Sequence, residues 1–281
     1  MQIIHTIKKM QNVSLAAKRE GKTIGFVPTM GALHQGHLSL IRRARNENDL
    51  TVLSIFVNPA QFSPLEDYTT YPQPFAQDKS FAKKENVDIL FHPTTDEMYP
   101  QEFLTFVNTE KINEGLCGAF RPVHFRGVTT VVTKLLHCVL PDKLYLGQKD
   151  AQQAVVLTHM ISDLNFPLQV KICPTIREKD GLAMSSRNQY LSPEQRKNAG
   201  ILYQSLLQAK KRISKGERDP NRIAEEVYAM IHPFADKVDY VECVNAENLE
   251  ILKSLRGRVL VALAAWFGKA RLIDNIIVRT P

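Results

Sequence analysis

Short apolar runs alternate with longer amphipathic stretches over the first two-thirds of the chain. The short runs are dense in β-branched and aromatic residues, which is typical of buried strands, whereas the amphipathic stretches have the apolar spacing of helices. The predicted strands cover residues 23–27, 51–57, 87–91, 143–146 and 168–173, and the predicted helices cover 36–46, 75–85, 128–139 and 150–164. This alternation predicts a parallel sheet with helices on both faces, and such sheets bind ligands beyond the carboxyl ends of their strands.

The pattern changes after about Ile176. A Ser cap, a Pro in the first turn and a Gln three residues after the cap predict a helix that begins at Ser192 and runs to about Ser214. One more predicted helix and three predicted strands follow, at residues 219–232, 238–244, 259–265 and 272–278. We therefore expect an α/β protein in which a Rossmann-like domain covers residues 1–176 and a smaller α+β domain covers 177–281.

Composition places the chain among globular proteins, because 44% of its 281 residues are hydrophobic and 23% are charged. Its formal net charge of +7 is compatible with nucleic acid, an anionic membrane or a small polyanion as partner. The basic clusters at residues 42–45 and 210–212 fall in helical patterns and lack interleaved aromatic residues. They are better explained as solvated helix faces than as a nucleic-acid surface.

The four cysteines are far apart and form neither a C-x-x-C pair nor a zinc-finger spacing with histidine, so we expect reduced thiols. The first ten residues lack the apolar core of a signal peptide. The apolar run at residues 259–267 is too short to span a bilayer. These features predict a cytoplasmic protein.

The segment between the first predicted strand and helix contains glycines and two histidines that are suited to binding a phosphate. Its sequence is Pro28-Thr29-Met30-Gly31-Ala32-Leu33-His34-Gln35-Gly36-His37. Its glycines allow a sharp turn, and the N–H groups of a helix start attract phosphate. His34 and His37 can donate hydrogen bonds to a phosphate that acquires charge. The glycine spacing is that of a P-loop, but His37-Leu38 replaces the required Lys-Ser/Thr, and no G-x-G-x-x-G is present.

The His34-x-Gly-His37 element resembles the signature of the HxGH nucleotidylyltransferase superfamily, which includes class I aminoacyl-tRNA synthetases. The whole string from residue 28 to 37 resembles one family in particular, the pantothenate synthetases. The resemblance implies condensation of (R)-pantoate with β-alanine to pantothenate through a pantoyl-adenylate, with release of AMP and pyrophosphate. It also implies Mg²⁺ with ATP as co-substrate, no tightly bound organic cofactor, and a homodimer.

For pantoate, the resemblance assigns six residues, namely Pro28, Thr29, Met30, Asn58, Gln61 and Gln153. Asn58 and Gln61 follow the second predicted strand, and Gln61 would bond the hydroxyl or carboxylate of pantoate. An Asn-Pro pair is by itself an ordinary turn, so this assignment depends on the other motifs. The block from Arg121 to Gly127 resembles a further family motif, for which a place near pantoate and a structural role are both open.

For ATP, the resemblance assigns Met30, His34, Gly36, His37, Gly147, Lys149, Asp150, Ile176, Met184, Ser185, Ser186 and Arg187. Lys149 would contact the phosphates and Asp150 the ribose hydroxyls. The segment from Met184 to Arg187 resembles a KMSKS-like loop that clasps the triphosphate, while backbone near Ile176 and Met184 would frame adenine. The catalytic set is then His34 and His37 on the transferring phosphate, with Lys149 and Arg187 on the leaving group.

Two positions fit the family less closely. Gln73 stands where the family often has Arg, and Asp78 is only weakly matched to an acidic residue near the metal–ATP complex, so no direct metal ligand is assigned. Three other functions stay open: a nucleotidylyltransferase with a stable product, a tRNA-binding synthetase relative, and a basic nucleic-acid module. The roughly one hundred residues after the phosphate loop leave little room for an anticodon domain, and we expect the smaller domain to act as a lid.

Overall fold

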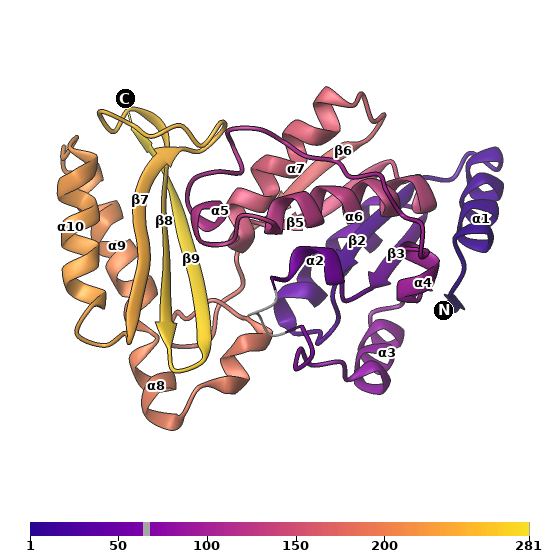
Figure 1. Cartoon of the computed structure of the whole chain (residues 1–281), viewed down its shortest axis with the longest axis horizontal. Helices are drawn as coiled ribbons and strands as arrows, with labels where there is room; N and C mark the ends of the chain where they lie inside the picture. The colour runs from indigo at the N-terminus through magenta and orange to yellow at the C-terminus, as the bar shows by residue number, and fades with distance from the viewer. Residues whose placement is uncertain (64–67, 281) are drawn as a thin grey trace. The chain divides into compact units, whose positions relative to one another are not determined.

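The computed structural model describes residues 1–63 and 68–280 and divides the chain into two compact units (Figure 1). Unit 1 comprises Met1–Thr109, Arg121–Gly147 and Val156–Cys173. Unit 2 comprises Glu110–Phe120, Gln148–Val155 and the chain from Pro174 onward. Unit 2 thus joins the C-terminal part of the chain to two earlier segments, one of which carries Lys149, Asp150 and Gln153.

Unit 1 is built on a six-stranded sheet in which every neighbouring pair is parallel, as the sequence pattern predicts. Its strands, in the spatial order β1-β4-β3-β2-β5-β6, are β1 (Gln2–Ile4), β4 (Ile89–Phe91), β3 (Leu50–Ile55), β2 (Ile24–Thr29), β5 (Lys143–Gly147) and β6 (Gln169–Cys173). Its helices are α1 (Ile7–Arg19), α2 (Gln35–Glu47), the 3₁₀ helix η1 (Pro59–Gln61), α3 (Phe75–Lys84), α4 (Thr95–Met98) and α6 (His124–Val139). Helix α7 (Ala151–Asp163) contributes residues to both units.

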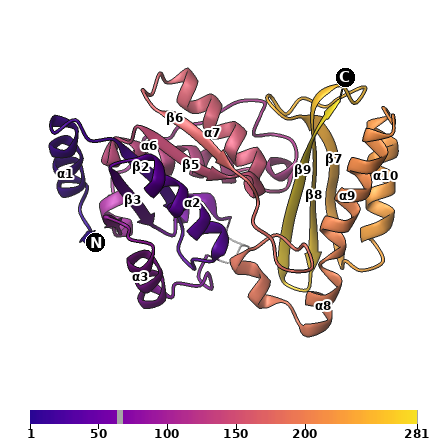
Figure 2. The same ribbon diagram turned by 180° about the vertical axis from the view of Figure 1, so that it is seen from behind.

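Helices cover both faces of this sheet. Val27 and Leu53 pack against Ile41 of α2 in one apolar cluster. Because side chains alternate along a strand, Phe26 and Val52 point to the opposite face, and both are fully buried there. Figure 1 shows α6 in front of the sheet, and Figure 2, from behind, shows α2 in front.

The order of the strands creates a point where the chain reverses direction across the sheet. Strand β2 lies between β3 and β5, so the chain leaves β2 toward one edge and returns on its other side. Ligands of open parallel sheets bind at such a point, beyond the carboxyl ends of the strands. The segments after Thr29 and Gly147 therefore start where a binding site is expected.

Unit 2 contains a three-stranded antiparallel sheet with helices α9 and α10 packed against it. Its elements are α5 (Cys117–Phe120), the 3₁₀ helices η2 (Gln148–Asp150) and η3 (Ser186–Tyr190), α8 (Pro193–Asn198), α9 (Ile201–Ser214), α10 (Pro220–Ile231), β7 (Lys237–Asn245), β8 (Gly257–Phe267) and β9 (Ala270–Thr280). Leu206 of α9, Val227 of α10 and Leu263 of β8 belong to one fully buried core. The α+β character expected for the C-terminal part is confirmed.

Differences from the predicted elements have local causes. The helix expected from 192 to 214 is two helices, with a turn at Ala199-Gly200 between α8 and α9. The first two elements, β1 and α1, were not predicted. Strand β1 has only three residues, and the N-cap of α1, Thr6, makes no side-chain capping bond.

All four cysteines lie among the described residues, and each is buried as a free thiol. Within residues 1–63 and 68–280, every helix is too short or too polar to span a bilayer.

Helix α6 comes unusually close to η1 at Gly127. A Cβ atom at this position would overlap the carbonyl group of Ala60 and the Cα of Gln61. These are backbone atoms, so a side chain there can be accommodated only if the helix and η1 move apart. The glycine therefore fixes how closely α6 supports the segment that follows β3.

We expect Gly127→Ala to lower the free energy of unfolding by about 1–3 kcal/mol, the usual cost of overpacking a well-packed interior. This loss should appear even though Ala is the better helix former by about 1 kcal/mol. Chemical denaturation measures it. Gly115→Ala is the matched control, because a Cβ there meets nothing within 4 Å. Equal stability of the two variants would contradict the close approach.

Candidate active site

The two histidines of the His34-x-Gly-His37 element cap helix α2 reciprocally. His34 is the N-cap residue, and its Nδ1 accepts from the N–H of Gly36 at 3.1 Å. Nδ1 of His37 accepts from the backbone N–H of His34 at 3.3 Å. Since both Nδ1 atoms accept from backbone donors, each neutral ring carries its proton on Nε2. The cap thus makes both imidazoles Nε2–H donors.

Gly36 is required by the packing of the His34 ring. A Cβ at Gly36 would lie 2.9 Å from Nδ1 of His34, the same atom that accepts the Gly36 N–H. The two imidazole rings are close together, with centroids 4.1 Å apart. The spacing His-x-Gly-His therefore places two donor rings side by side at the start of a helix, where the helix dipole favours an anion.

Asp78 of α3 holds the loop that leads into this cap. Its Oδ2 accepts from the N–H of Ala32 at 2.9 Å, and its Oδ1 accepts from the N–H of Leu33 at 2.7 Å. The residue is 1% exposed, and burial raises the pKa of its carboxyl group while the two backbone bonds act in the opposite direction. Gly31 and Ala32 have left-handed backbone, with φ of +84° and +49°, so the loop needs such an anchor.

Three of the residues assigned to pantoate come together in unit 1. Asn58 and Gln61 are 1% and 7% exposed, and Nδ2 of Asn58 donates to Oε1 of Gln61 at 3.0 Å. Nε2 of Gln61 lies 3.3 Å from the sulfur of Met30. Pro28 and Thr29 are the last residues of β2, and the Thr29 hydroxyl donates to the carbonyl of Ser54.

The block from Arg121 to Gly127 supports the backbone of Gln61. Nδ1 of His124 lies 3.0 Å from the carbonyl oxygen of Gln61, which can only accept. Nδ1 therefore carries the proton, and Nε2 accepts from Nη1 of Arg121 at 3.2 Å. Of the two roles left open by the sequence, this geometry supplies a structural one next to the residues assigned to pantoate.

In unit 2, Asn275 of β9 holds the segment that carries Lys149 and Asp150. Nδ2 of Asn275 donates to the carbonyl oxygens of Gln148 and Lys149, both at 2.9 Å. The Lys149 ammonium lies 3.5 Å from Oδ1 of Asp150. Gln153, in the first turn of α7, is half-buried. The backbone of η2 is therefore fixed to the three-stranded sheet.

The second segment assigned to ATP is fixed to the same place on β9. Arg177 forms a two-pronged ion pair with Asp274, with Nη1–Oδ2 and Nη2–Oδ1 distances of 2.6 and 3.0 Å. Its guanidinium also lies 3.6 Å from the centroid of the Tyr203 ring. Such buried planar pairing is the geometry for which Arg is best suited.

This anchor leads directly into the KMSKS-like loop. The N–H of Met184 donates to the carbonyl of Ile176 at 3.0 Å, which closes a hairpin around the Arg177 turn. The Ser185 hydroxyl then accepts from the N–H of Arg187 at 3.3 Å and caps η3, which begins at Ser186. Asp274 and Asn275 thus connect the Lys149 segment to the Met184–Arg187 loop within unit 2.

The sequence reasoning missed Asp274, Asn275 and Tyr99, and it linked Asp78 only to metal. One signal was available for the first two, because an Asp-Asn pair interrupts the apolar run predicted as the last strand. A buried polar pair in a strand needs specific partners. Nothing local to Tyr99 or Asp78 indicates which backbone or amide groups they meet.

Comparison with known proteins identifies the relatives of this chain. A family model described as pantoate-beta-alanine ligase matches residues 2–277. The pantothenate synthetase of Caldicellulosiruptor bescii is 52% identical over 279 residues, which cover 99% of both chains. That of Thermotoga petrophila is 55% identical over 279 residues, which cover 99% of this chain and 100% of the relative.

Solved structures agree with the sequence comparison. The crystal structure of pantothenate synthetase from Thermus thermophilus matches with a TM-score of 0.93 at 42% identity, over 100% of both chains. The structure of pantoate-beta-alanine ligase from Francisella tularensis, complexed with beta-gamma ATP and beta-alanine, matches with a TM-score of 0.82 at 35% identity, over 99% of this chain and 97% of the other. The chain therefore belongs to the pantoate–β-alanine ligase family, whose members are named pantothenate synthetases.

Proposed function

We propose that this ligase works in two steps that consume ATP. The carboxylate of (R)-pantoate attacks the α-phosphorus of Mg²⁺-ATP, so that a P–O bond forms to give pantoyl-adenylate and pyrophosphate leaves. The amine of β-alanine then attacks the acyl carbon of the mixed anhydride, loses a proton and expels AMP. Family membership gives the joining of pantoate to β-alanine, and the ATP and β-alanine complex named for the Francisella relative supports these co-substrates.

One observation carries the first step, namely the tautomer that the α2 cap imposes on His34 and His37. Both Nδ1 atoms accept from backbone N–H groups, so Nε2–H is the donor that each neutral ring can offer to an anion. Charge accumulates on the oxygens of the α-phosphate as the carboxylate attacks. Preorganised donors stabilise such charge without having to reorient. We assign these two residues to that phosphate, next to Gly36 and Met30.

Magnesium enters this proposal as part of the substrate Mg²⁺-ATP. Within the described ranges, no group of three or more His, Cys, Asp or Glu side chains could hold a metal ion. Both oxygens of Asp78, the residue that resemblance linked to the metal, bind loop N–H groups. Magnesium in phosphoryl-transfer sites is held largely by water and substrate phosphates, so we assign the ion to ATP.

The remaining assignments follow the chemistry of each group. We assign the cationic groups of Lys149 and Arg187 to the leaving pyrophosphate, with the hydroxyls of Ser185 and Ser186 beside Arg187. Asp150 would accept from the ribose diol, and the backbone of Gly147, Ile176 and Met184 would contact the nucleotide. Pantoate would meet Pro28, Thr29, Met30, Asn58, Gln61 and Gln153.

Four further expectations from the sequence stay predictions, namely a domain boundary at 176, lid closure, a homodimer and a cytoplasmic location.

The test of the overall reaction is incubation with ATP, pantoate and β-alanine, with each omitted in turn. We expect pantothenate and AMP only in the complete mixture, and pyrophosphate whenever ATP and pantoate are both present. A nucleotidylyltransferase that makes a stable product would instead retain AMP in that product. Release of AMP independent of β-alanine would also contradict the second step.

We expect His37→Asn to slow adenylate formation by about a hundredfold, the usual effect of removing one preorganised donor. The asparagine oxygen can replace Nδ1 as the acceptor in the cap, so the thermal stability should change little while the Nε2–H donor is lost. Pantoate-dependent ATP–pyrophosphate exchange measures the rate. His37→Ala should lose at least as much, and His232→Ala, at an exposed site beyond α10, is the control. Normal exchange in both His37 variants would remove this residue from the mechanism.

Lys149→Ala should also slow the exchange by about a hundredfold, because the leaving pyrophosphate loses a compensating charge. The exposed Lys253→Ala is its control. Unchanged exchange in Lys149→Ala would remove the lysine from the phosphate site even if the histidine result held.

Asn275→Asp should raise the KM for ATP by about tenfold or more, since a carboxylate oxygen would face the carbonyls of Gln148 and Lys149 in place of the amide donor. The KM for pantoate should change much less. Asn221→Asp, exposed in the first turn of α10, introduces the same charge where a helix start tolerates it. Initial rates over an ATP series measure the effect, and an equal KM in both variants would show that β9 does not position the Lys149 segment.

A further inference from the structure

We propose that Tyr99 is a positioning residue for pantoate, which acts through Asn58 to hold the Gln61 side-chain amide in place. The proposal rests on the function proposed above and goes beyond it, because neither the motifs nor the assigned residues include Tyr99. It also specifies the kind of group that Gln61 binds, namely a hydrogen-bond acceptor on the substrate.

The orientation of the Asn58 amide is determined by two backbone partners. Its Oδ1 accepts from the N–H of Ala60 at 3.3 Å, and its Nδ2 donates to the carbonyl of Gly127 at 3.1 Å. A backbone N–H can only donate and a carbonyl can only accept, so the opposite orientation would break both bonds. The close approach of α6 at Gly127 therefore helps to set which end of the Asn58 amide is the oxygen and which is the nitrogen.

Two side-chain hydrogen bonds are added to the Asn58 amide in this orientation. The hydroxyl of Tyr99 lies 2.7 Å from Oδ1 of Asn58 and must donate to it, since Oδ1 is an acceptor. On the other side, Nδ2 of Asn58 donates to Oε1 of Gln61 at 3.0 Å. The amide oxygen of Gln61 is thereby used, and its Nε2 is directed toward the sulfur of Met30 at 3.3 Å.

This arrangement leaves the strong donor of Gln61 facing a weak acceptor. A thioether sulfur accepts hydrogen bonds poorly, so a carboxylate or hydroxyl oxygen of a bound substrate would be the better partner. The sequence resemblance left the hydroxyl and the carboxylate of pantoate open as partners. We call the hydrogen-bonded series Tyr99, Asn58 and Gln61 the amide chain. It requires that the pantoate group, whether hydroxyl or carboxylate, accepts a hydrogen bond from Nε2 of Gln61.

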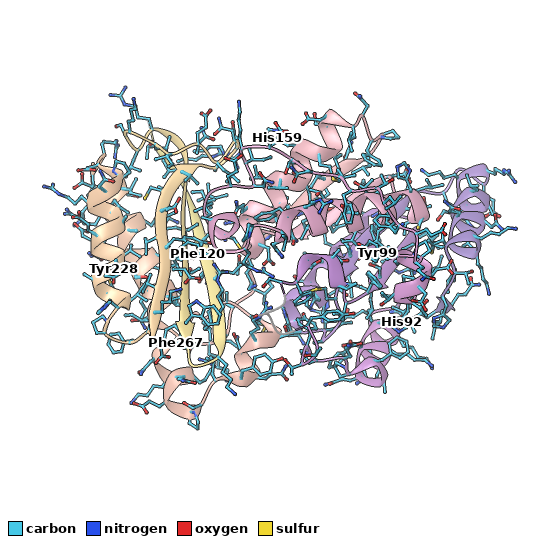
Figure 3. All side chains as sticks on the ribbon, in the orientation of Figure 1. His92, Tyr99, Phe120, His159, Tyr228 and Phe267 are labelled. Atoms are coloured by element: carbon cyan, nitrogen blue, oxygen red, sulfur yellow. The ribbon has the colours of Figure 1, made fainter. Side chains whose placement is uncertain are left out.

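Tyr99 is itself held firmly enough to keep Asn58 in place. It follows helix α4, and Figure 3 labels its side chain. Its ring centroid lies 5.0 Å from that of Phe103, in an edge contact, and 6.3 Å from that of Phe56, in a tilted contact. The ammonium of Lys134 lies 5.6 Å from the ring centroid. Burial raises the pKa of Tyr99 well above its ordinary value, so the hydroxyl stays protonated and remains a donor.

The decisive variant is Tyr99→Phe, which removes the hydroxyl and keeps the ring contacts. We expect the KM for pantoate to rise roughly tenfold, as for the loss of one hydrogen bond, while the KM for ATP stays within about twofold. Tyr145→Phe is the matched control. It removes another buried hydroxyl of unit 1, which bonds Asn48 and Glu47 and has no contact with the amide chain.

Two further variants separate failure of this inference from failure of the proposed function. Gln61→Glu replaces the Nε2 donor by an acceptor and should raise the pantoate KM more than Tyr99→Phe does, because it would repel an acceptor on the substrate. If Gln61→Glu weakens pantoate but Tyr99→Phe matches the wild type, the positioning role of Tyr99 is wrong and the pantoate assignment stands. If neither variant changes the pantoate KM, the assignment of Gln61 itself fails.

The thermal midpoints of all variants are measured alongside the rates. A purely structural role for Tyr99 would lower the midpoint and change the kinetic constants for ATP and pantoate together. That outcome would overturn the proposal. A rise confined to pantoate, with Tyr145→Phe equal to the wild type, would support it.

Discussion

Polar side chains that are buried or half-buried bond one of their polar atoms within the protein, and this constraint sets the direction of the donors in the candidate site. His34 and His37 use Nδ1 on backbone N–H groups, which places the ring proton on Nε2. Gln61 uses its amide oxygen on Asn58, which turns the amide nitrogen the other way. In each case a fold-stabilising bond determines which chemical group can face a ligand. Stability and function are therefore not separable at these positions.

Close backbone approach is the second requirement, and it explains why glycines recur in the motifs. Gly36 makes room for the ring that caps α2, and Gly127 allows α6 to reach the backbone of η1. The approach at Gly127 brings a carbonyl to Asn58, and that carbonyl fixes the amide chain. The two glycines thus act through the polar groups that they bring together. Glycines in such motifs are therefore needed for close packing of the backbone, in addition to the side chains that carry the chemistry.

The sequence predicted the parallel sheet, most of its strands and the place of the His34–His37 cap, because these follow from local periodicity and capping chemistry. It did not predict β1, whose three residues depend on pairing with β4. The roles of Asp78, Tyr99 and Asn275 were also out of reach, since their partners lie 46, 41 and 126 residues away in the chain. Hydrogen bonds over such separations leave no periodic signal. The family resemblance therefore supplied a set of residues for the site, and the structure adds the hydrogen bonds that orient them.

The amide chain helps to distinguish between the reactions that this fold could catalyse. An HxGH cap at the end of a parallel strand would suit any enzyme that attacks an α-phosphate, so it does not by itself distinguish a ligase from a nucleotidylyltransferase. Asn58 and Gln61 are buried beside Met30, and burying two amides is unfavourable unless each is bonded. The chain from Tyr99 to Gln61 satisfies both and still turns one N–H toward a weak acceptor. Such a directed donor next to the β2 loop suits an oxygen-rich acid as the nucleophile. The same bonds that make the segment stable thus leave a donor for which an oxygen acceptor is the better partner, as the proposed binding of pantoate requires.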